Sequence, residues 1–391
     1  MQTVGWPRVM LLADASPAWL AACRVQEDRA RESLERLGSQ TAATLWRERS
    51  GRDDPPAFTL VLPIHDEERA LPSVLHALLG CWLPPDAQVT IALVTNACAD
   101  ASADIARAFL AGLGTPAAAD LQDLDDAGIT APPAAVRCGA VEFLHVDTAT
   151  PGKANALDLG NRIARARGHA IACSMDTNNW PEPDTLAVLW GDARRLREDD
   201  AALLYATPVT MFRRHPGSLY NALQRSRDAR PARPEEGRLE LPGWMLAWDA
   251  AWLEAAGGVP HTATEDFALA VLARAHGRAV GVSEARIWGF GISTLGDLLR
   301  GARRFVRGEL QLRALAADDP AFSAAAEREI LHARPFGVRL GRFLALIRRR
   351  PLSLPMQLVK WLVWETGLAL GRRDYRRDPK SSSWQAIDTT K

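Results

Sequence analysis

Residues 171–184 combine an apolar segment with a group of short polar side chains. The sequence Ile-Ala-Cys-Ser-Met at 171–175 is typical of a buried strand, and Asp-Thr-Asn-Asn follows at 176–179. In α/β sheets, ligands bind at the carboxyl ends of the parallel strands. Carboxylate and amide oxygens gathered there suit a hard cation that bridges to phosphate. The same residue types also form ordinary turns, so the segment alone leaves both interpretations open.

A second candidate for chemistry is the acidic pair Glu265 and Asp266, which precedes the apolar-periodic segment 267–275. A carboxylate in a fixed position can act as a general base and take a proton from a hydroxyl group. Acidic side chains are also favoured at the start of a helix by the helix dipole. The pair is therefore either a catalytic base with its neighbour or an ordinary helix N-terminus.

The elements that must position these residues alternate between strands and helices. Strands are predicted at 58–62, 88–95, 141–146, 171–175, 202–207 and 243–248. Helices are predicted at 71–79, 103–110, about 150–167, from near 184, and at 215–228, 250–256 and 267–275. Strand, polar tip and helix in repetition indicate a parallel sheet of the α/β class. Residues 112–139 interrupt this alternation and are predicted to be a long surface excursion without chemistry.

Composition narrows the class of protein and its compartment. The 391 residues contain 47 basic and 47 acidic side chains, so no basic surplus indicates a nucleic-acid partner. The five cysteines are scattered and form no C-x-x-C pair, which favours a reducing compartment over a zinc site or a disulfide framework. No signal peptide and no membrane-spanning segment is recognisable, so we expect a cytoplasmic protein.

The C-terminal region has a different character from the rest of the chain. Between residues 331 and 377 it carries eleven basic and two acidic residues, interleaved with Phe and Trp. A basic amphipathic region of this kind can lie on an anionic membrane surface. A helical subdomain with a solvated basic face is the alternative.

Six motifs in order together resemble the family-two glycosyltransferases, which have the GT-A fold. They are Pro63-Ile-His-Asp-Glu-Glu after the first strand, Asn96-Ala-Cys-Ala-Asp, Pro151-Gly-Lys-Ala-Asn-Ala-Leu, Met175-Asp-Thr-Asn-Asn-Trp-Pro-Glu-Pro-Asp-Thr-Leu, Gly257-Gly258 with Thr264-Glu265-Asp266, and Gly301-Ala-Arg-Arg304-Phe305. The resemblance covers roughly residues 58–312. It implies a Rossmann-like, mostly parallel central sheet flanked by helices.

The resemblance also implies roles for individual residues. Pro63, His65 and Asp66 would border the nucleotide base and ribose, Asn96 would read the base, and Lys153 would lie near the base or the diphosphate. Asp176 and Asn178 would hold a divalent metal ion, Mn²⁺ or Mg²⁺, with Asp176 also on the nucleotide sugar. Asp266 would be the catalytic base, Glu265 would support it, and Trp244 and Arg304 would line the acceptor and diphosphate side.

Two departures from the family pattern are informative. Asn178 stands where the family usually has a second carboxylate, and an amide adds no negative charge, so metal affinity should fall. Gly301 and Phe305 replace the Gln and Trp that mark processive polysaccharide synthases, which also carry membrane spans. The resemblance therefore favours transfer of a single sugar.

The sequence thus predicts three parts: an N-terminal helical extension and linker at 1–56, a GT-A-like domain at 57–312, and a basic helical region with a flexible tail at 313–391. We expect inverting transfer of a hexosyl or related group from a nucleotide-sugar donor to a glycan or lipid-linked acceptor, in cell-surface polysaccharide or glycolipid biosynthesis. The enzyme would be cytoplasmic, with peripheral contact to the inner membrane face.

Other classes of protein remain as alternatives. A non-catalytic nucleotide-sugar-binding or scaffold protein on the same fold is motivated by Asn178. A dinucleotide-dependent oxidoreductase is disfavoured because no G-x-G-x-x-G follows the first predicted strand.

Overall fold

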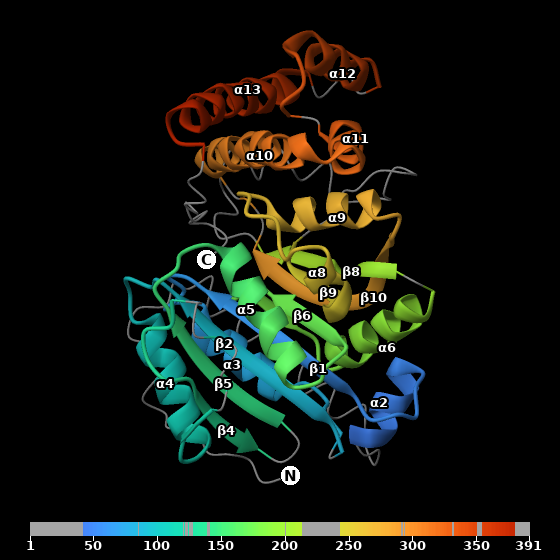
Figure 1. Ribbon diagram of the computed structural model, residues 1–391. Helices are drawn as coiled ribbons and strands as arrows, with labels where there is room; N and C mark the ends of the chain where they lie inside the picture. The colour runs from blue at the N-terminus through green and yellow to red at the C-terminus, as the bar shows by residue number, and fades with distance from the viewer. Residues whose placement is uncertain are drawn as a thin grey trace.

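The computed structural model describes residues 42–84, 86–119, 121, 124, 128–138, 141–199, 201–212, 243–290, 292, 294–330, 332–349 and 354–379. These described residues form a central sheet of ten strands, in the order β3-β4-β5-β2-β1-β6-β9-β8-β10-β7. Figure 1 shows this sheet flanked by helices, with further helices stacked beyond one side of it.

The first half of the sheet is parallel. Strand β1 (Ala57–Ile64) lies between β2 (Gln88–Asn96) and β6 (Ile171–Met175), and β2 also pairs with β5 (Val141–Thr148). The connecting helices are α3 (Leu71–Leu79), α4 (Ser102–Leu113) and α5 (Lys153–Ala166), and α6 (Thr185–Glu198) follows β6. The predicted alternation of strands and helices is confirmed, and all four strands direct their carboxyl ends to one edge of the sheet.

The second half of the sheet is mixed. Strand β9 (Met245–Asp249) runs antiparallel to both β6 and β8 (Ala201–Phe212), whereas β10 (Ala279–Phe290) is parallel to β8. The short strand β7 (Asn179–Pro181) closes the edge against β10. Because Met175 at the end of β6 pairs with Met245 at the start of β9, the residues that precede β9 lie beside those that follow β6.

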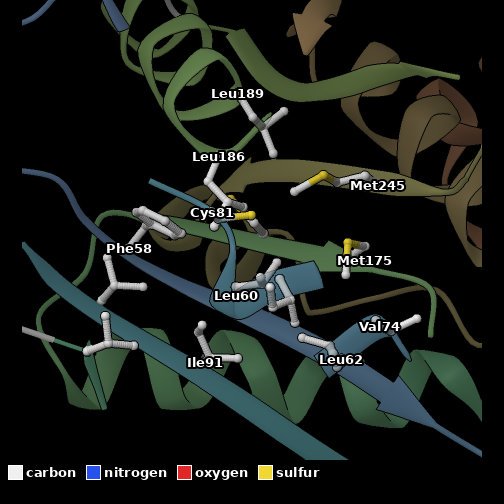
Figure 2. Close-up of a cluster of buried hydrophobic side chains, with 14 of the residues drawn as sticks. Phe58, Leu60, Leu62, Val74, Cys81, Ile91, Met175, Leu186, Leu189 and Met245 are labelled. Carbon is white, nitrogen blue, oxygen red and sulfur yellow. The ribbon is translucent and has the colours of Figure 1, made fainter. Parts of the chain in front are cut away.

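The core follows from the strict alternation of side chains along β1. Phe58, Leu60 and Leu62 point to one face and pack with α3 and α6, as Figure 2 shows for Val74, Leu186 and Leu189. Val61 points to the opposite face and belongs to the cluster with α5. Both faces of the strand are apolar because helices cover both, as is usual for parallel sheets.

Helix α5 approaches β1 closely at one glycine. A Cβ atom at Gly160 would collide with the side chain of Val61. This contact sets the close packing of α5 on the sheet, and hence the position of Lys153 at the start of α5. Gly160 thus helps to fix the position of Lys153, a predicted site residue.

Near the N-terminal end of the described chain, helix α2 (Ala42–Ser50) packs on α6. Trp46 is buried, with its ring 5.6 Å from that of Trp190, and Gly191 leaves room for the backbone of Ser50. Residues 1–41 of the predicted N-terminal helical extension, and the helix predicted at 215–228, lie outside the described residues.

The C-terminal helices form separate layers beyond the sheet (Figure 1). Helix α10 (Leu295–Leu315) lies between α9 (Glu265–Ala275) and the long helix α13 (Leu354–Arg377), and α11 (Pro320–Glu329) and α12 (Phe336–Arg349) complete the layers. Helix α10 continues across the predicted domain boundary at 312. Among the described residues, no helix is both long and apolar enough to span a bilayer.

The predicted fold class, an α/β fold with a mostly parallel sheet flanked by helices, is confirmed. The interruption predicted at 112–139 also contains structure: β4 (Ala134–Cys138) pairs antiparallel with β5, and β3 (Ala117–Ala118) pairs antiparallel with β4. Strand β4 was missed because its sequence, Ala-Ala-Val-Arg-Cys, contains few of the large β-branched or aromatic residues that indicate strands. Strand β10 was not predicted either.

Candidate active site

The candidate active site lies where α5, α9 and α10 meet the carboxyl end of β6. Lys153 is the first residue of α5, and Glu265 is the first residue of α9. The Nζ atom of Lys153 lies 2.6 Å from Oδ1 of Asp176 and 2.9 Å from Oε1 of Glu265. The structure therefore joins two predicted functional segments, 176–179 and 264–266, through one lysine side chain.

The Lys153 ammonium group is surrounded by oxygen atoms of the protein. Besides the two carboxylate oxygens, the carbonyl oxygen of Gly243 accepts a hydrogen bond from it at 3.4 Å. The side chain is only 6% exposed. Burial by itself would lower the pKa of Lys153, but the charges of Asp176, Glu265 and Asp266 outweigh it and raise the pKa. Lys153 therefore stays charged and links the two carboxylates.

Glu265 is the most deeply buried acidic group of this cluster. Burial alone would raise its pKa, but Lys153 and the guanidinium group of Arg304, 3.9 Å away, lower it below the usual range. Glu265 is therefore ionised at neutral pH. Its charge is balanced by Lys153 and Arg304, so it has no free role as a proton acceptor and is better suited to positioning its neighbours.

Asp266 differs from Glu265 although the two are adjacent in the sequence. Burial and the negative charge of Glu265 raise the pKa of Asp266 to about 6, against the smaller opposing effects of Lys153 and Arg304. Its Oδ1 atom accepts a hydrogen bond from the backbone N–H of Phe267. A carboxylate whose pKa lies near the operating pH is well matched to general base catalysis.

Gly243 is a site residue that the sequence analysis missed. A Cβ atom at this position would collide with the Asp266 carboxylate, and the Gly243 carbonyl accepts from Lys153. Its neighbour Trp244 accepts, through its backbone oxygen, from the N–H of Asp176 at 2.9 Å and from Nδ2 of Asn179 at 3.3 Å. Gly243 begins a predicted strand, and no local signal distinguishes it from an ordinary strand-end glycine.

Helix α10 holds the segment that leads into the acidic pair. Nε of Arg304 donates to the carbonyl oxygen of Ala263 at 2.7 Å, and Oε1 of Gln311 accepts from the Ala263 N–H at 2.8 Å. Between them, Gly308 leaves room for Thr264. Residues 304, 308 and 311 share one helix face by their spacing. Arg304 was predicted, whereas Gln311 has no motif that could have indicated it.

The predicted nucleotide side lies next to this cluster. Nδ2 of Asn96, at the end of β2, donates to the carbonyl oxygen of Gly152 at 2.6 Å, immediately before Lys153. The backbone oxygen of Asn96 lies 2.7 Å from Nδ1 of His65. Thr177, next to Asp176, donates to the carbonyl oxygen of Pro63 at 3.4 Å. The ends of β1, β2 and β6 are therefore connected by short contacts.

Asp66 organises the turn after β1. It adopts φ = 52°, a left-handed conformation that Asp tolerates better than most residues, and its Oδ1 accepts from the backbone N–H of Ala99. Asp66, Cys98 and Asp100 have potential ligand atoms within 4.8 Å of one another. Asp100 accepts from the N–H groups of Glu68 and Ser102, and Cys98 lies against the Ile64 carbonyl. These contacts explain the cluster as a connection between two loops.

The predicted metal position offers a limited donor set. Asp176 supplies a carboxylate, whose Oδ1 is already on Lys153, and half-buried Asn178 supplies a neutral amide. Three carboxylates of the cluster (Asp176, Glu265 and Asp266) face two cations (Lys153 and Arg304), so full ionisation leaves one excess negative charge. This charge and the remaining Asp176 oxygen fit a weakly held divalent cation, as expected from the amide at 178.

The structure thus brings together Lys153, Asp176, Glu265, Asp266, Arg304 and the Trp244 backbone, and places Pro63, His65 and Asn96 on the adjoining strand ends. The predicted roles of these residues, and those of Asp66 and Asn178, stay predictions.

Comparisons with known proteins give fold-level similarity only. No family model and no curated protein matches the chain. Among solved structures, it resembles the mannosyltransferase PcManGT of Pyrobaculum calidifontis in complex with GDP-mannose and Mn²⁺, with a TM-score of 0.48 and 16% identity over 91% of this chain and 100% of that one. It also resembles S. aureus TarS 1–349, with a TM-score of 0.39 and 12% identity over 82% of this chain and 91% of that one.

A third similar structure is glucosyl-3-phosphoglycerate synthase from Mycobacterium tuberculosis with Mn²⁺, UDP and phosphoglyceric acid. Its TM-score is 0.35, with 18% identity over 62% of this chain and 72% of that one. These proteins are GT-A-type glycosyltransferases, the class that the sequence motifs resemble. At such TM-scores no residue role is transferred from them.

Proposed function

We propose that the protein is a glycosyltransferase that moves one sugar from a nucleotide-sugar donor to an acceptor hydroxyl group with inversion. The observation that carries this proposal is the contact of the Asp176 segment and the Glu265–Asp266 pair across Lys153. A donor-binding strand end and a candidate base are thereby held in one cluster, which is the arrangement that sugar transfer requires.

In the proposed reaction, the acceptor oxygen forms a bond to the anomeric carbon while the bond from that carbon to the diphosphate oxygen breaks. The diphosphate leaves with the electron pair of that bond, and the acceptor proton passes to the Asp266 carboxylate. A pKa near 6 keeps Asp266 mostly ionised at neutral pH and still basic enough to accept the proton. A single displacement of this kind inverts the anomeric centre.

The remaining side chains would bind and orient the reactants. Arg304, 23% exposed and close to Glu265, is the cation that can reach the leaving diphosphate. Asp176 and Asn178 would hold a divalent cation, Mn²⁺ or Mg²⁺, whose charge would offset that of the diphosphate. Because Lys153 is buried and paired with Asp176 and Glu265, we assign it to holding the donor and base sides together, not to direct phosphate binding.

The second candidate is a nucleotide-sugar-binding protein without turnover on the same fold. The amide at Asn178 and the limited donor set favour it, because weaker metal binding stabilises a leaving diphosphate less. Pro63, His65, Asp66 and Asn96 would then bind the nucleoside while Asp266 had no proton to accept. The glycan or lipid-linked acceptor, and a role in cell-surface polysaccharide or glycolipid synthesis, belong to the transferase proposal only.

Calorimetric titration with UDP, GDP, ADP, CMP and dTDP tests the proposal, with Mn²⁺, Mg²⁺ or EDTA present. We expect one nucleotide to bind best, and its affinity to fall on Asp176→Ala. The matched control is Asp104→Ala, since the Asp104 side chain is 78% exposed on α4. The matching nucleotide sugar is then tested for turnover with an acceptor panel, and the anomeric configuration of the product is read by NMR.

The outcomes separate the two candidates. Turnover that is lost in Asp266→Asn, with nucleotide affinity unchanged, supports the transferase. Binding without turnover on any acceptor supports the binding protein, and no binding of any nucleotide refutes both.

A further inference from the structure

Large apolar side chains are exposed in one part of the molecule. The described residues expose nine of them, and eight lie on α10, α12 and α13. The exception, Val282, is on β10. Figure 1 shows α12 and α13 as the layer farthest from the sheet, with α10 beneath α13. Such a concentration of exposed apolar groups commonly marks an interaction surface.

Helix α13 exposes a single strip. Among its described side chains, at 357–377, the exposed ones are Leu358, Val359, Leu362, Thr366, Ala369, Arg373, Arg376 and Arg377. With 3.6 residues per turn, these positions fall within about 100° of arc. The strip is apolar in its first half and basic at its end, and it carries no acidic residue.

The opposite side of α13 packs against the rest of the protein. Leu368 is fully buried, and Gly367 and Gly371 bring the helix against the backbone of α10. The strip therefore faces away from the domain and cannot be covered by α10.

Helix α12 adds to the apolar half of the strip. The Phe343 ring stacks on Trp361 of α13 at 4.8 Å, and the Phe336 ring lies 5.7 Å from Trp361. Phe336 and Leu344 of α12 are themselves 51% and 52% exposed. Leu358 precedes Trp361 by three residues in α13, so the two are neighbours on the helix surface, and apolar residues of both helices therefore lie next to Trp361.

The acidic residues of the two helices are neutralised internally. Glu365 forms a two-bond pair with Arg339, at 2.8 and 2.5 Å, and Asp374 is bound by Arg303 of α10 at 2.6 Å. The exposed charges of the strip are then Arg373, Arg376 and Arg377, all positive. The surface thus combines apolar side chains with three positive charges, and the exposed acidic residue next to them is Asp378, just beyond the end of α13.

We propose that this surface docks on an anionic lipid bilayer. We define the docking surface as the exposed strip of α13 together with Phe336 and Leu344 of α12. Leu358, Val359 and Leu362 would enter the boundary between headgroups and acyl chains, and the three arginines would contact lipid phosphates, as in interfacial amphipathic helices. An anionic bilayer offers an apolar phase for the apolar side chains and negative charge for the arginines. The inference does not depend on the proposed enzymatic function.

Flotation of the full chain with phosphatidylcholine vesicles, with and without phosphatidylglycerol, tests the proposal. We expect flotation with the anionic vesicles only, and its loss at high salt. The double variant Leu358→Glu, Leu362→Glu should remain at the bottom of the gradient. The control Val282→Glu, which changes a side chain that is 57% exposed on β10, should float like the wild type.

Charge is tested separately with Arg373→Gln, Arg376→Gln. At about 1 kcal/mol per basic residue near the surface, this double variant should bind about 25-fold more weakly. Circular dichroism shows whether each variant is folded. The proposal is overturned by no flotation on anionic vesicles, by equal flotation on neutral vesicles, or by wild-type flotation of the leucine variant. It is also overturned if the same leucines mediate a dimer in light scattering while lipid binding is absent.

Discussion

Lys153→Met should destabilise the protein in a way that depends on pH. The substitution keeps most of the aliphatic volume and removes the charge shared by Asp176 and Glu265, whose side chains are only 19% and 3% exposed. Breaking a buried ion pair by removing one partner typically costs about 3–5 kcal/mol. Arg304 remains 3.9 Å from Glu265 and water reaches Asp176, so we expect about 3 kcal/mol at pH 7.

The dependence of this destabilisation on pH tests whether its cause is electrostatic. Burial already raises the pKa of Asp176 against the opposing charge of Lys153, so removal of Lys153 raises it further. The pKa of Glu265, which Lys153 and Arg304 hold below its usual range, rises as well. A raised carboxyl pKa is a stability cost that is fully present above the folded-state pKa and disappears as pH falls towards the unfolded-state pKa, about 4. The difference in unfolding free energy between wild type and variant should therefore be largest at neutral pH and shrink as the medium becomes acidic.

Urea denaturation at a series of pH values from neutral to mildly acidic measures this difference. Adding Glu265→Gln to Lys153→Met should recover part of the loss, because it removes one uncompensated charge, and a double-mutant cycle gives the coupling. A loss that is the same at every pH, or one below about 1 kcal/mol at pH 7, would refute the electrostatic account and indicate a packing effect.

Two further substitutions test the geometry around Asp266. Gly243→Ala places a methyl group against the Asp266 carboxylate and should lower turnover about 100-fold with little change in nucleotide affinity, whereas Gly112→Ala, with no atom within 4 Å of its Cβ, should leave turnover unchanged. Equal effects of the two glycine variants would contradict the contact. The turnover rate should also rise with pH around the Asp266 pKa of about 6, because the base must be ionised. Since Arg304 lowers that pKa, Arg304→Met should move the rise to higher pH, and a move to lower pH would show that Asp266 is not the base.

The acidic pair shows that the two interpretations of a motif can both be correct. Glu265 and Asp266 do occupy the first turn of α9, as the helix-dipole interpretation requires. They also meet Lys153 and Arg304, which that interpretation does not predict. The helix was predicted to start at 267, two residues later than it does. Glu265 is in fact the first residue of α9 and is buried.

The sequence by itself determined the strands, helices and strand-end motifs of the first half of the fold. Helix α3 covers 71–79 as predicted, and β1, β2, β5 and β6 include the predicted apolar segments, because buried parallel strands and amphipathic helices have strong local patterns. The parallel arrangement follows from their alternation, and it explains why Asp176, Asn96 and Pro63 lie at one edge of the sheet.

Only the tertiary structure decided how these residues are used. The antiparallel pairing of β9 with β6 brings Gly243 to Asp266 and Lys153, and α10 brings Arg304 and Gln311 to Ala263, across long separations in the sequence. The opposite pKa shifts of the neighbouring residues Glu265 and Asp266 depend on which carboxylate faces the two cations. Such contacts come from packing between distant segments, so no local pattern encodes them, whereas periodicity encodes the elements themselves.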